Sequence, residues 1–388
     1  MHAPRKLLRI TTVPVSLHLL LRGQLLFFQG RGYEVLAVSA PGPEVDTLKN
    51  QGIRHASVPM TRTITPWRDL VNLFLLCRIM HRFRPHIVHT HTPKAGLLGM
   101  LAAWLCRVPV RLHTVAGLPL MESSGFQRRL LRLTEQVTYG CAHAVYPNSF
   151  GLLSFMQQEM GVGTRPKFKV LGHGSTNGID TSYFSSSDPI REEALRLRAR
   201  LGIGPGAAVF LFIGRLVPDK GIRELIEAFR GLSITDHSFL VLVGPPEAEA
   251  PLSADTQRTL ENHPHIRAVG FQVDVRPWLA MATAFVFPSY REGFPNVVMQ
   301  AACMEVPCIV SDINGCNELI EPGVRGWVVP AKQVLPLRSA MEEVVREKEK
   351  AARYAKASRN WVVSHYDQRQ VWTRLSDEYE KHLKHVPD

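Results

Sequence analysis

The stretch YREGFPNVVMQAACMEVPCIVSDINGCNELI, residues 290–320, alternates turns with short helical and strand-like runs. Glu292 is followed at once by a flexible turn at residues 293–296, and an apolar helix is expected from Val297 to about Met304. A strand-like run and a second turn come next, at residues 307–310 and 311–315, and this turn opens another helix. Turn, helix and strand in such close succession are typical of α/β folds.

The turn after Glu292 is suited to holding an anion. N–H groups at the start of a helix have no partner within the helix, and the helix dipole adds positive potential there. Residues 293–296 are therefore expected to bind a phosphate, while the carboxylate of Glu292 takes a neutral hydroxyl group. A sugar nucleotide carries both groups.

Strand-like and helical runs alternate in the same way through the first half of the chain. Strands are expected at residues 7–12, 34–39, 86–90, 110–114 and 144–147. Helices are expected between them, at residues 17–29, 67–83, 94–106, 127–141 and 150–160. This alternation predicts a parallel sheet that is covered by helices on both faces.

A polar, glycine-rich stretch at residues 172–188 marks the expected domain junction, after which the alternation starts again. Strands are expected at residues 208–213, 239–243, 266–268, 284–288, 308–310 and 326–329. Helices are expected at residues 221–232, 256–262, 275–282, 296–304, 335–353 and 368–385.

The predicted fold class is α/β, with two Rossmann-like doubly wound domains facing a central cleft. The acceptor-binding domain is placed at residues 1–180 and the nucleotide-binding domain at residues 181–366, and a last helix within residues 367–388 is expected to cross back to the first domain. Ligands of open α/β sheets bind beyond the carboxyl ends of the strands, so the site is expected in the cleft.

The composition is that of a globular chain with excess positive charge. Of its 388 residues 45% are hydrophobic and 21% charged, and the net charge is +12. This balance favours a phosphorylated substrate, an anionic lipid surface or nucleic acid, unless it serves solubility alone. Nucleic acid is disfavoured, because the sequence has no zinc-finger spacing, no aromatic-rich ribonucleoprotein pattern and no concentrated basic arm.

Cysteine usage and the N-terminus bear on the compartment. None of the six cysteines forms a C-x-x-C pair, which indicates a reduced, cytoplasmic protein. The N-terminus, MHAPRKLLRITTVPVS, has no long apolar core and no cleavage site, and is interpreted as a first strand rather than a signal peptide. No uncharged apolar window of about 18 residues exists, so no membrane span is expected.

Two cations mark a second loop. Arg215 and Lys220 lie in FIGRLVPDKGIRELIEAF, residues 212–229, between a strand and a helix. Two cations beside a helix N-terminus can clamp a diphosphate, and the alternative is that both are ordinary surface charges. The first strand is followed by no G-x-G-x-x-G, which argues against a dehydrogenase, and a Walker A sequence is absent too.

No specific metal signature is present, since the sequence lacks D-x-D, H-x-x-x-H and H-E-x-x-H. His89 and His91 have strand spacing, which suggests either a metal pair or, as preferred here, His91 at the strand end facing the cleft with His89 on the opposite side. His113 ends the strand-like run VRLHT, where a histidine either contacts a ligand or is structural.

The segment WRDLVNLFLLCRIMHRFR, residues 67–84, is apolar on one face and basic at its end. Residues 17–28 and 97–106 are also rich in leucine. Each segment is either an ordinary helix packed on the sheet or an amphipathic helix on a bilayer. Their presence in one half of a basic chain favours an anionic membrane surface as a partner.

Three motifs together resemble the family-4 retaining glycosyltransferases of the GT-B fold. They are E-G-F-P-N-V-V at Glu292, G-R-L-V-P-D-K-G at Gly214 and N-G-I-D at Asn177, and the resemblance covers nearly the whole chain. The runs HTHTPKAGLLGMLAA, HTVAGLPL, GFQRRLL and GHGSTNGID are similar to bacterial enzymes that extend a sugar on a polyprenyl diphosphate in capsule, O-antigen or protein-glycan assembly. One such enzyme is the N-acetylgalactosaminyltransferase that acts on undecaprenyl-diphosphate-bacillosamine.

The resemblance implies roles on the donor side. Arg215 and Lys220 would bind the diphosphate and neutralise the leaving nucleotide. Glu292 and His113 would be the catalytic residues, Glu292 contacting the donor sugar and His113 contacting it near the reacting carbon. The turn would bind sugar hydroxyls and phosphate through its residues Gly293, Phe294, Pro295 and Asn296.

On the acceptor side, the resemblance implies contacts from His91 and Lys94, with Lys94 meeting the lipid diphosphate. The sequence departs from the family pattern at two places. The second glutamate of E-x7-E is Gln300, which still hydrogen-bonds ribose hydroxyls but without charge-assisted strength. The glycine-rich loop after the first strand is replaced by VPVSLHLLLRGQ, which alters the acceptor-side geometry.

The predicted reaction is a retaining transfer from a UDP-sugar, an N-acetylhexosamine donor, to a polyprenyl-diphosphate-linked saccharide, without a metal or other cofactor. The enzyme is expected in the cytoplasm, peripheral on the inner face of the cell membrane. The main alternative is a UDP-sugar epimerase of similar fold, and a second is a non-catalytic sugar-nucleotide-binding protein.

Overall fold

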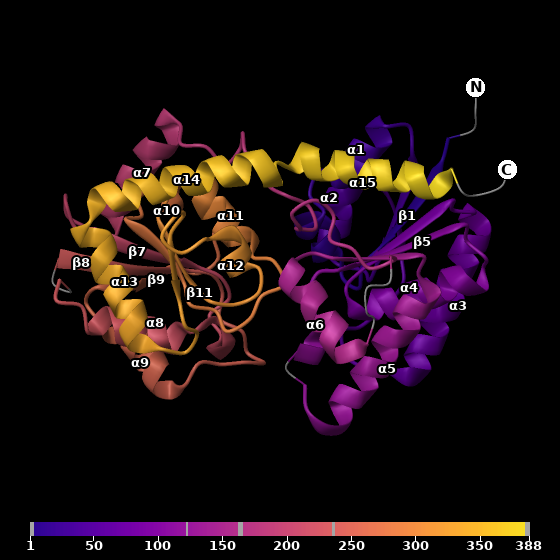
Figure 1. Ribbon diagram of the computed structural model, residues 1–388, viewed down its shortest axis with the longest axis horizontal. Coiled ribbons are helices and arrows are strands. Elements are labelled where there is room, and N and C mark those ends of the chain that lie inside the picture. The colour runs from indigo at the N-terminus through magenta and orange to yellow at the C-terminus, as the bar shows by residue number, and fades with distance from the viewer. Residues whose placement is uncertain (1–3, 122, 162–165, 235–236, 385–388) are drawn as a thin grey trace. The chain divides into compact units, whose positions relative to one another are not determined.

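The computed structural model describes residues 4–121, 123–161, 166–234 and 237–384, and the chain forms two compact units (Figure 1). The N-terminal unit comprises Met1–Gly178 together with Gln368–Asp388, and the C-terminal unit comprises Ile179–Asp367. The unit bounds lie within two residues of the domain limits expected from the sequence, and the last segment groups with the N-terminal unit.

The N-terminal unit is built on a six-stranded parallel sheet with the strand order β3-β2-β1-β4-β5-β6. The strands are β1 (Lys6–Ile10), β2 (Glu34–Ser39), β3 (Arg54–Ser57), β4 (Ile87–His91), β5 (Val110–Val115) and β6 (Ala144–Pro147). The helices are η1 (Ser16–Leu20), α1 (Gln24–Gly30), α2 (Glu44–Asn50), α3 (Pro66–Phe83), α4 (Pro93–Leu105), η2 (Pro119–Met121), α5 (Gly125–Cys141), α6 (Phe150–Met160) and α15 (Gln368–Leu383).

Both faces of this sheet are buried, as predicted. Leu8 and Val88 point into a core shared with α3, α4, α5 and α6. Leu7 and Ile87 point the other way, into a core shared with α1 and with α15, which lies beside α1 in Figure 1. Because helices cover both faces, the strand ends are where this sheet can present functional groups.

The C-terminal unit repeats the same plan, with the strand order β12-β11-β10-β7-β8-β9. The strands are β7 (Ala208–Ile213), β8 (Ser238–Val243), β9 (Ile266–Ala268), β10 (Ala284–Phe287), β11 (Cys308–Ser311) and β12 (Trp327–Val329). The helices are α7 (Asp188–Arg200), η3 (Pro218–Lys220), α8 (Ile222–Arg230), α9 (Ala254–Asn262), α10 (Arg276–Ala280), α11 (Asn296–Cys303), α12 (Cys316–Leu319), α13 (Val334–Arg346) and α14 (Lys348–Tyr366). Among the helices described in the two units, none is both long and apolar enough to cross a membrane.

The strand order reverses at one point in each sheet. In the N-terminal unit this point lies between β1 and β4, and in the C-terminal unit it lies between β7 and β10. Loops that leave the carboxyl ends of such a strand pair diverge and open a crevice, which is where doubly wound folds bind ligands. The predicted site residues His91, Lys220 and Glu292 end or follow these strands.

Several predicted elements differ from the structure. The expected helix at residues 17–29 is divided into η1 and α1 at Gly23, which has a φ of 77°. A Cβ atom there would lie 2.8 Å from the indole of Trp372, so both backbone and packing require glycine. The expected helix at residues 335–353 breaks at Glu347 into α13 and α14. The elements α2, β3 and α7 were not predicted, because their polar sequences carry a weak hydrophobic period.

Glu135 on α5 is a buried carboxyl group in the N-terminal unit. It is 4% exposed, and its Oε2 has no hydrogen-bond partner within the described residues. Burial raises its pKa to about 7, and the hydroxyl of Tyr139 opposes this shift. The folded protein therefore keeps this proton to about neutral pH, whereas the unfolded chain loses it near pH 4.5.

We expect Glu135→Gln to stabilise the protein at pH 8 much more than at pH 5. As pH rises from 4.5 to about 7, only the unfolded state gives up the proton, so the wild-type protein loses roughly 3 kcal/mol of unfolding free energy that the glutamine variant keeps. Urea unfolding at the two pH values measures the difference. The same effect at both values would contradict the raised pKa.

Candidate functional site

The C-terminal unit presents two loops at the reversal point of its sheet. One follows β7 and leads through residues 214–221 into α8, and the other follows β10 and leads through residues 288–295 into α11. The loops are fastened to each other at Asp219, whose carbonyl accepts from the N–H of Tyr290 at 2.8 Å and whose carboxylate pairs with Arg291 at 2.8 Å. They therefore form one surface rather than two independent turns.

Lys220 and Glu292 form the central contact between these loops. Nζ of Lys220 lies 2.5 Å from Oε1 of Glu292, and the two side chains are only 13% and 18% exposed. The hydroxyl of Ser289 donates to the same carboxylate oxygen at 3.2 Å. Oε2 of Glu292 makes no hydrogen bond within the described part of the chain, so it is available to accept one from a ligand.

The turn after Glu292 is held in place by the second turn of the stretch at residues 311–315. The side-chain amide of Asn314 donates to the carbonyls of Glu292 and Gly293, at 3.0 and 2.8 Å. Gly315 has a φ of 75°, and a Cβ atom there would lie 2.7 Å from the carbonyl oxygen of Gly293. These contacts turn the carbonyls towards the protein.

The N–H groups of the turn are the next feature of this surface. Those of Gly293, Phe294 and Asn296 make no hydrogen bond within the described residues, while Pro295 has no N–H to offer. The ring of Phe294 anchors the turn, since it packs 5.2 Å from the ring of Tyr366 in α14. Unpaired N–H groups at the start of a helix can bind an anion, so the geometry of this turn is compatible with the anion site that the sequence predicts.

Two more predicted residues belong to this surface. Gln300 follows the turn in sequence, and Arg215 follows β7, the strand that neighbours β10 in the sheet. Gln300 lies one helical turn beyond Asn296 in α11, is half-buried, and its amide makes no hydrogen bond within the described residues. Arg215 follows β7 and is paired with Glu247, with half of its side chain exposed. An exposed pair of this kind is worth about 0–1 kcal/mol, so an anionic ligand can displace Glu247 at little cost.

In the N-terminal unit, His113 lies near the end of β5 and is almost fully buried. Its Nδ1 bonds with the hydroxyl of Thr90 at 2.8 Å, and its Nε2 makes no hydrogen bond within the described residues. Gly96 of α4 lies over the ring, where a Cβ atom would be 2.5 Å from Cε1. Burial lowers the pKa of His113 to about 4, so the imidazole is neutral at physiological pH.

His89 and His91 lie on the same face of β4, and the prediction that they face opposite sides is wrong. Residues two apart along a strand share a face. Their rings stack with centroids 4.5 Å apart, and both side chains are buried. Burial holds both pKa values well below 6.5. Within the described residues, no three His, Cys, Asp or Glu side chains gather as a metal-binding group.

Lys94, in the first turn of α4, is engaged inside the unit. Its ammonium lies 2.8 Å from Oδ1 of Asp69, the first-turn carboxylate of α3. The same ammonium donates to the carbonyl of Thr63 and to the hydroxyls of Thr61 and Thr65. A contact between Lys94 and a ligand phosphate therefore requires exchange with Asp69, a pairing that was not predicted from the sequence.

Sequence reasoning missed Asp219, Ser289 and Asn314, which position the predicted residues. Each lies within four residues of a predicted loop or turn, and two of them belong to or border the stretch at residues 290–320. The presence of polar side chains next to the predicted loops could have pointed to them. It would not have shown their role, because only the folded structure shows which carbonyl or carboxylate each side chain contacts.

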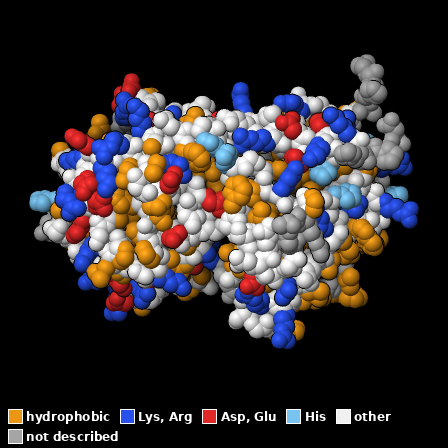
Figure 2. All heavy atoms as spheres, viewed as in Figure 1, with side chains coloured by type: hydrophobic (Ala, Val, Ile, Leu, Met, Phe, Trp, Pro, Cys, Tyr) orange, Lys and Arg blue, Asp and Glu red, His pale blue; other side chains and the backbone are white. Residues whose placement is uncertain are grey.

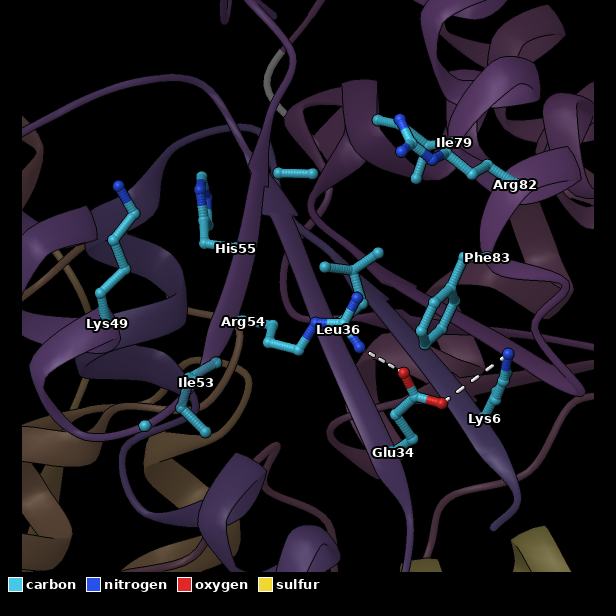
Figure 3. Close-up of a pocket in the computed structure, with 12 residues that line it drawn as sticks. Lys6, Glu34, Leu36, Lys49, Ile53, Arg54, His55, Ile79, Arg82 and Phe83 are labelled. Carbon is cyan, nitrogen blue, oxygen red and sulfur yellow. Dashed lines mark hydrogen bonds and ion pairs between the residues drawn. The ribbon is translucent and has the colours of Figure 1, made fainter. Parts of the chain in front are cut away.

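A cavity of about 740 Å³ lies elsewhere, at the amino-terminal ends of β1 and β2 and beside β3 (Figure 3). Figure 3 shows Glu34 bridging Arg54 and Lys6 across its floor. None of the predicted site residues lines it. It opens at the edge of the sheet opposite to the carboxyl ends, so it is separate from the candidate site.

The chain matches two described families and several characterised relatives. "Glycosyl transferase 4-like domain" matches residues 27–172, and "Glycosyl transferases group 1" matches residues 194–361. The capsular polysaccharide biosynthesis glycosyltransferase CapM of Staphylococcus aureus is 30% identical over 383 residues, 98% of each chain. The UDP-Gal:alpha-D-GlcNAc-diphosphoundecaprenol alpha-1,3-galactosyltransferase of Escherichia coli is 28% identical over 312 residues, 79% of this chain and 78% of that one.

Among solved structures, that of Anabaena Alr3699/HepE in complex with UDP superposes with a TM-score of 0.80. It covers 97% of this chain and 100% of its own, at 18% identity. At this identity the likeness concerns the fold, and it confirms the predicted α/β architecture of two doubly wound domains.

Gly221 links Lys220 to α8 and offers a test of how tightly the two loops fit. It has a φ of 69°, and a Cβ atom there would lie 2.2 Å from the carbonyl oxygen of Pro288. Gly202 has a φ of 70° with no atom within 4 Å of an added Cβ. We expect Gly202→Ala to cost about 1–2 kcal/mol and Gly221→Ala at least about 2 kcal/mol more, measured by urea unfolding. Equal losses would show that the loops have room to separate.

Proposed function

The chain belongs to the family-4 glycosyltransferases of the GT-B fold, and on that basis we propose that it transfers a sugar from a UDP-sugar to a saccharide on a polyprenyl diphosphate. The observation that carries the proposal is the Lys220–Glu292 pair beside the unpaired N–H groups of the turn at residues 293–296. A cation, a free carboxylate oxygen and N–H donors in one place match a nucleoside-diphosphate sugar. The product would enter bacterial surface polysaccharide or glycan assembly.

Relatives support the proposed substrates. The E. coli relative is described as using UDP-Gal and an acceptor on diphosphoundecaprenol, and HepE binds UDP. CapM belongs to capsular polysaccharide biosynthesis. We take UDP as the carrier and a polyprenyl diphosphate as the acceptor anchor, with an N-acetylhexosamine as the donor sugar that the sequence resemblance implies.

The proposed reaction retains the anomeric configuration by a front-face mechanism. The bond between sugar C1 and the diphosphate oxygen breaks while a bond from C1 to the acceptor hydroxyl oxygen forms on the same face, and the leaving phosphate takes the acceptor's proton. Arg215, Lys220 and the N–H groups at the start of α11 stabilise the departing charge. These residues supply positive charge of the kind that a metal ion supplies in other transferases, so the proposal includes no metal.

His113 has a binding role in this scheme. A histidine with a pKa of about 4 is neutral at physiological pH, so it does not protonate the leaving group. Its Nδ1 already forms a hydrogen bond with Thr90, so Nε2 is the ring nitrogen proposed to bind the donor sugar near the reacting carbon. Gln300 is proposed to bind the ribose through its unengaged amide.

The electrostatic difference between the units supports an anionic acceptor. The N-terminal unit contains 25 Lys and Arg against 11 Asp and Glu, whereas the C-terminal unit contains 21 against 23. The N-terminal unit thus carries +14 and the C-terminal unit −2 of the net charge of +12. A polyprenyl diphosphate and an anionic bilayer are both negative, and the N-terminal unit is the proposed partner of both.

Helix α3 offers the surface for a bilayer. It exposes Trp67, Leu70, Val71 and Phe74 at helical spacing. The end of α4 adds the exposed side chains of Trp104 and Leu105. This end lies beside α3, as the distance of 3.7 Å between Cys106 Sγ and the carbonyl oxygen of Cys77 shows. Figure 2 shows hydrophobic side chains gathered over these helices.

Charge accompanies this apolar surface. Between residues 58 and 108 the chain has seven Lys and Arg but a single acidic residue, Asp69, which is paired with Lys94. An apolar face with a basic surround binds anionic lipid surfaces. We propose that the enzyme acts in the cytoplasm, peripherally attached to the inner face of the cell membrane.

Nucleotide release with and without a short polyprenyl-diphosphate saccharide tests the transferase proposal. We expect UDP release from a UDP-N-acetylhexosamine to require the acceptor and to be unchanged by EDTA. Glu292→Gln and Lys220→Met should lower it at least about a hundredfold, because each removes a group aimed at the donor. Arg196→Met, which removes an exposed cation of α7, should leave it unchanged.

Other outcomes of that assay decide between the alternatives. Isomerisation of a free UDP-sugar without acceptor would establish the epimerase. Donor binding without release or isomerisation, across a panel of UDP-, GDP- and dTDP-sugars and acceptors, would favour the binding protein.

Vesicle binding tests the α3 surface. Phe74 on α3 and Phe271 in the C-terminal unit are 67% and 68% exposed, so they form a matched pair. We expect Phe74→Ser to weaken sedimentation with phosphatidylglycerol vesicles at low salt by about tenfold, since burying such a side chain is worth roughly 1.5–3 kcal/mol. Phe271→Ser should have no effect. Equal behaviour of the two variants, or no binding by the wild-type protein, would refute the membrane surface.

A further inference from the structure

A chain of buried hydrogen bonds runs across the N-terminal unit from β1 to the end of β5. Arg9 of β1 donates from Nη1 to the hydroxyl of Tyr379 in α15 at 2.5 Å. The same hydroxyl lies 2.6 Å from Nδ1 of His89, whose Nε2 lies 2.8 Å from the hydroxyl of Thr114. The four side chains come from β1, α15, β4 and β5.

This chain of hydrogen bonds begins at a buried cation, the guanidinium of Arg9. Arg9 is fully buried, and its second Nη atom donates to the side-chain oxygen of Gln24. No Asp or Glu pairs with it among the residues that the structure describes. Burial of an unpaired charge is costly, so Arg9 depends on the two polar contacts and on the ring of Phe28, 5.9 Å from its guanidinium carbon.

One order of donors satisfies every group of this chain of hydrogen bonds. Arg9 can only donate, so the oxygen of Tyr379 accepts from it, and the hydroxyl proton is assigned to Nδ1 of His89, the other group that this hydroxyl contacts among the described residues. His89 is then the neutral tautomer with its proton on Nε2, which donates to Thr114. Both nitrogens of His89 are therefore occupied, and its ring is held at both ends.

His91 rests on this fixed ring. The two imidazoles stack at 4.5 Å with an angle of 28° between their planes. Unlike His89, His91 has no hydrogen-bond partner for either ring nitrogen within the described residues, although both nitrogens are buried. Buried polar atoms are nearly always paired, so an unpaired ring at the end of β4 indicates a partner that comes from outside the unit's own side chains.

The chemistry of that partner follows from the ring. Burial and the nearby cation Arg9 keep the pKa of His91 far below 6.5, so one nitrogen carries a proton and the other a lone pair. A hydroxyl group both donates and accepts, and it satisfies such a ring fully. A phosphate oxygen only accepts, and it would leave the lone pair unpaired.

We propose that His91 recognises a sugar hydroxyl of the acceptor saccharide and that Tyr379, through His89, is the positioning residue for His91. The inference rests on the proposed function, because it assigns part of the acceptor site. The proposal gives the C-terminal helix a role beyond packing. Tyr379, 290 residues away from His89 in sequence, holds the ring of His89, and the ring of His91 stacks on it.

Equilibrium binding of two lipids tests the proposal without relying on turnover. The probes are a short polyprenyl diphosphate that carries one saccharide and the same polyprenyl diphosphate without sugar. We expect the wild-type protein to prefer the sugar-bearing lipid by about tenfold or more, and Tyr379→Phe to abolish the preference while leaving affinity for the bare lipid and for UDP unchanged.

A second tyrosine provides the matched control. Tyr33 donates to Glu380 of the same helix at 2.8 Å, so Tyr33→Phe also removes one hydroxyl contact of α15 but none to a histidine. It should lower the melting temperature without changing the preference. If Tyr379→Phe does not fold, Thr114→Val breaks the far end of the chain on a strand that tolerates valine, and it should also abolish the preference.

The outcomes separate this inference from the proposed function. Equal binding of both lipids by the wild-type protein, or an equal loss of preference in the Tyr33 and Tyr379 variants, would overturn the positioning role. A preference that disappears only with Tyr379→Phe, in a protein that fails to release UDP, would support the inference and reject the transferase.

Discussion

Each unit of this protein depends on a parallel sheet that is covered by helices on both faces. Such a sheet can expose functional groups only beyond its strand ends, and the reversal of strand order, between β1 and β4 and between β7 and β10, opens a crevice there. Lys220 and Glu292 meet at one of these points. The sheet topology thus brings these candidate site residues together.

The two units then differ in how they handle charge. Around the turn of the C-terminal unit, Lys220, Arg215 and Arg291 are each paired with a carboxylate. Those carboxylates hold the cations in place, and under the proposed function the donor diphosphate would compete for them. The N-terminal unit holds a large uncompensated positive charge, which suits the proposed lipid diphosphate and membrane surface. A C-terminal unit of small net charge and a basic N-terminal unit are consistent with the proposal that the donor comes from solution and the acceptor from a membrane.

The C-terminal helix is part of the N-terminal unit's interior. Tyr379 stacks on Phe28 and bonds with Arg9 and His89, and Trp372 bonds with Asn177 at 2.7 Å. Asn177 belongs to the N-G-I-D motif, and in this structure that motif residue helps to hold the C-terminal helix in place. An unpaired buried arginine would destabilise the sheet without these contacts, so the helix both completes a core and satisfies a charge.

The sequence by itself determined the alternation of strands and helices, because hydrophobic period and turn residues act over a few neighbours. The strands β2, β7 and β9 and the helix α6 agree residue for residue with expectation, and the turn after Glu292 was placed correctly. Polar elements such as β3 and α2 were not predicted, because their hydrophobic periodicity is weak.

Tertiary structure alone decided which side chains meet. It engaged Lys94 with Asp69, put His89 and His91 on one face, and joined Arg9 to Tyr379 across 370 residues. The physical reason is that a hydrogen bond depends on distances of about 3 Å, which folding sets between segments far apart in the chain. Local periodicity carries no information about those distances.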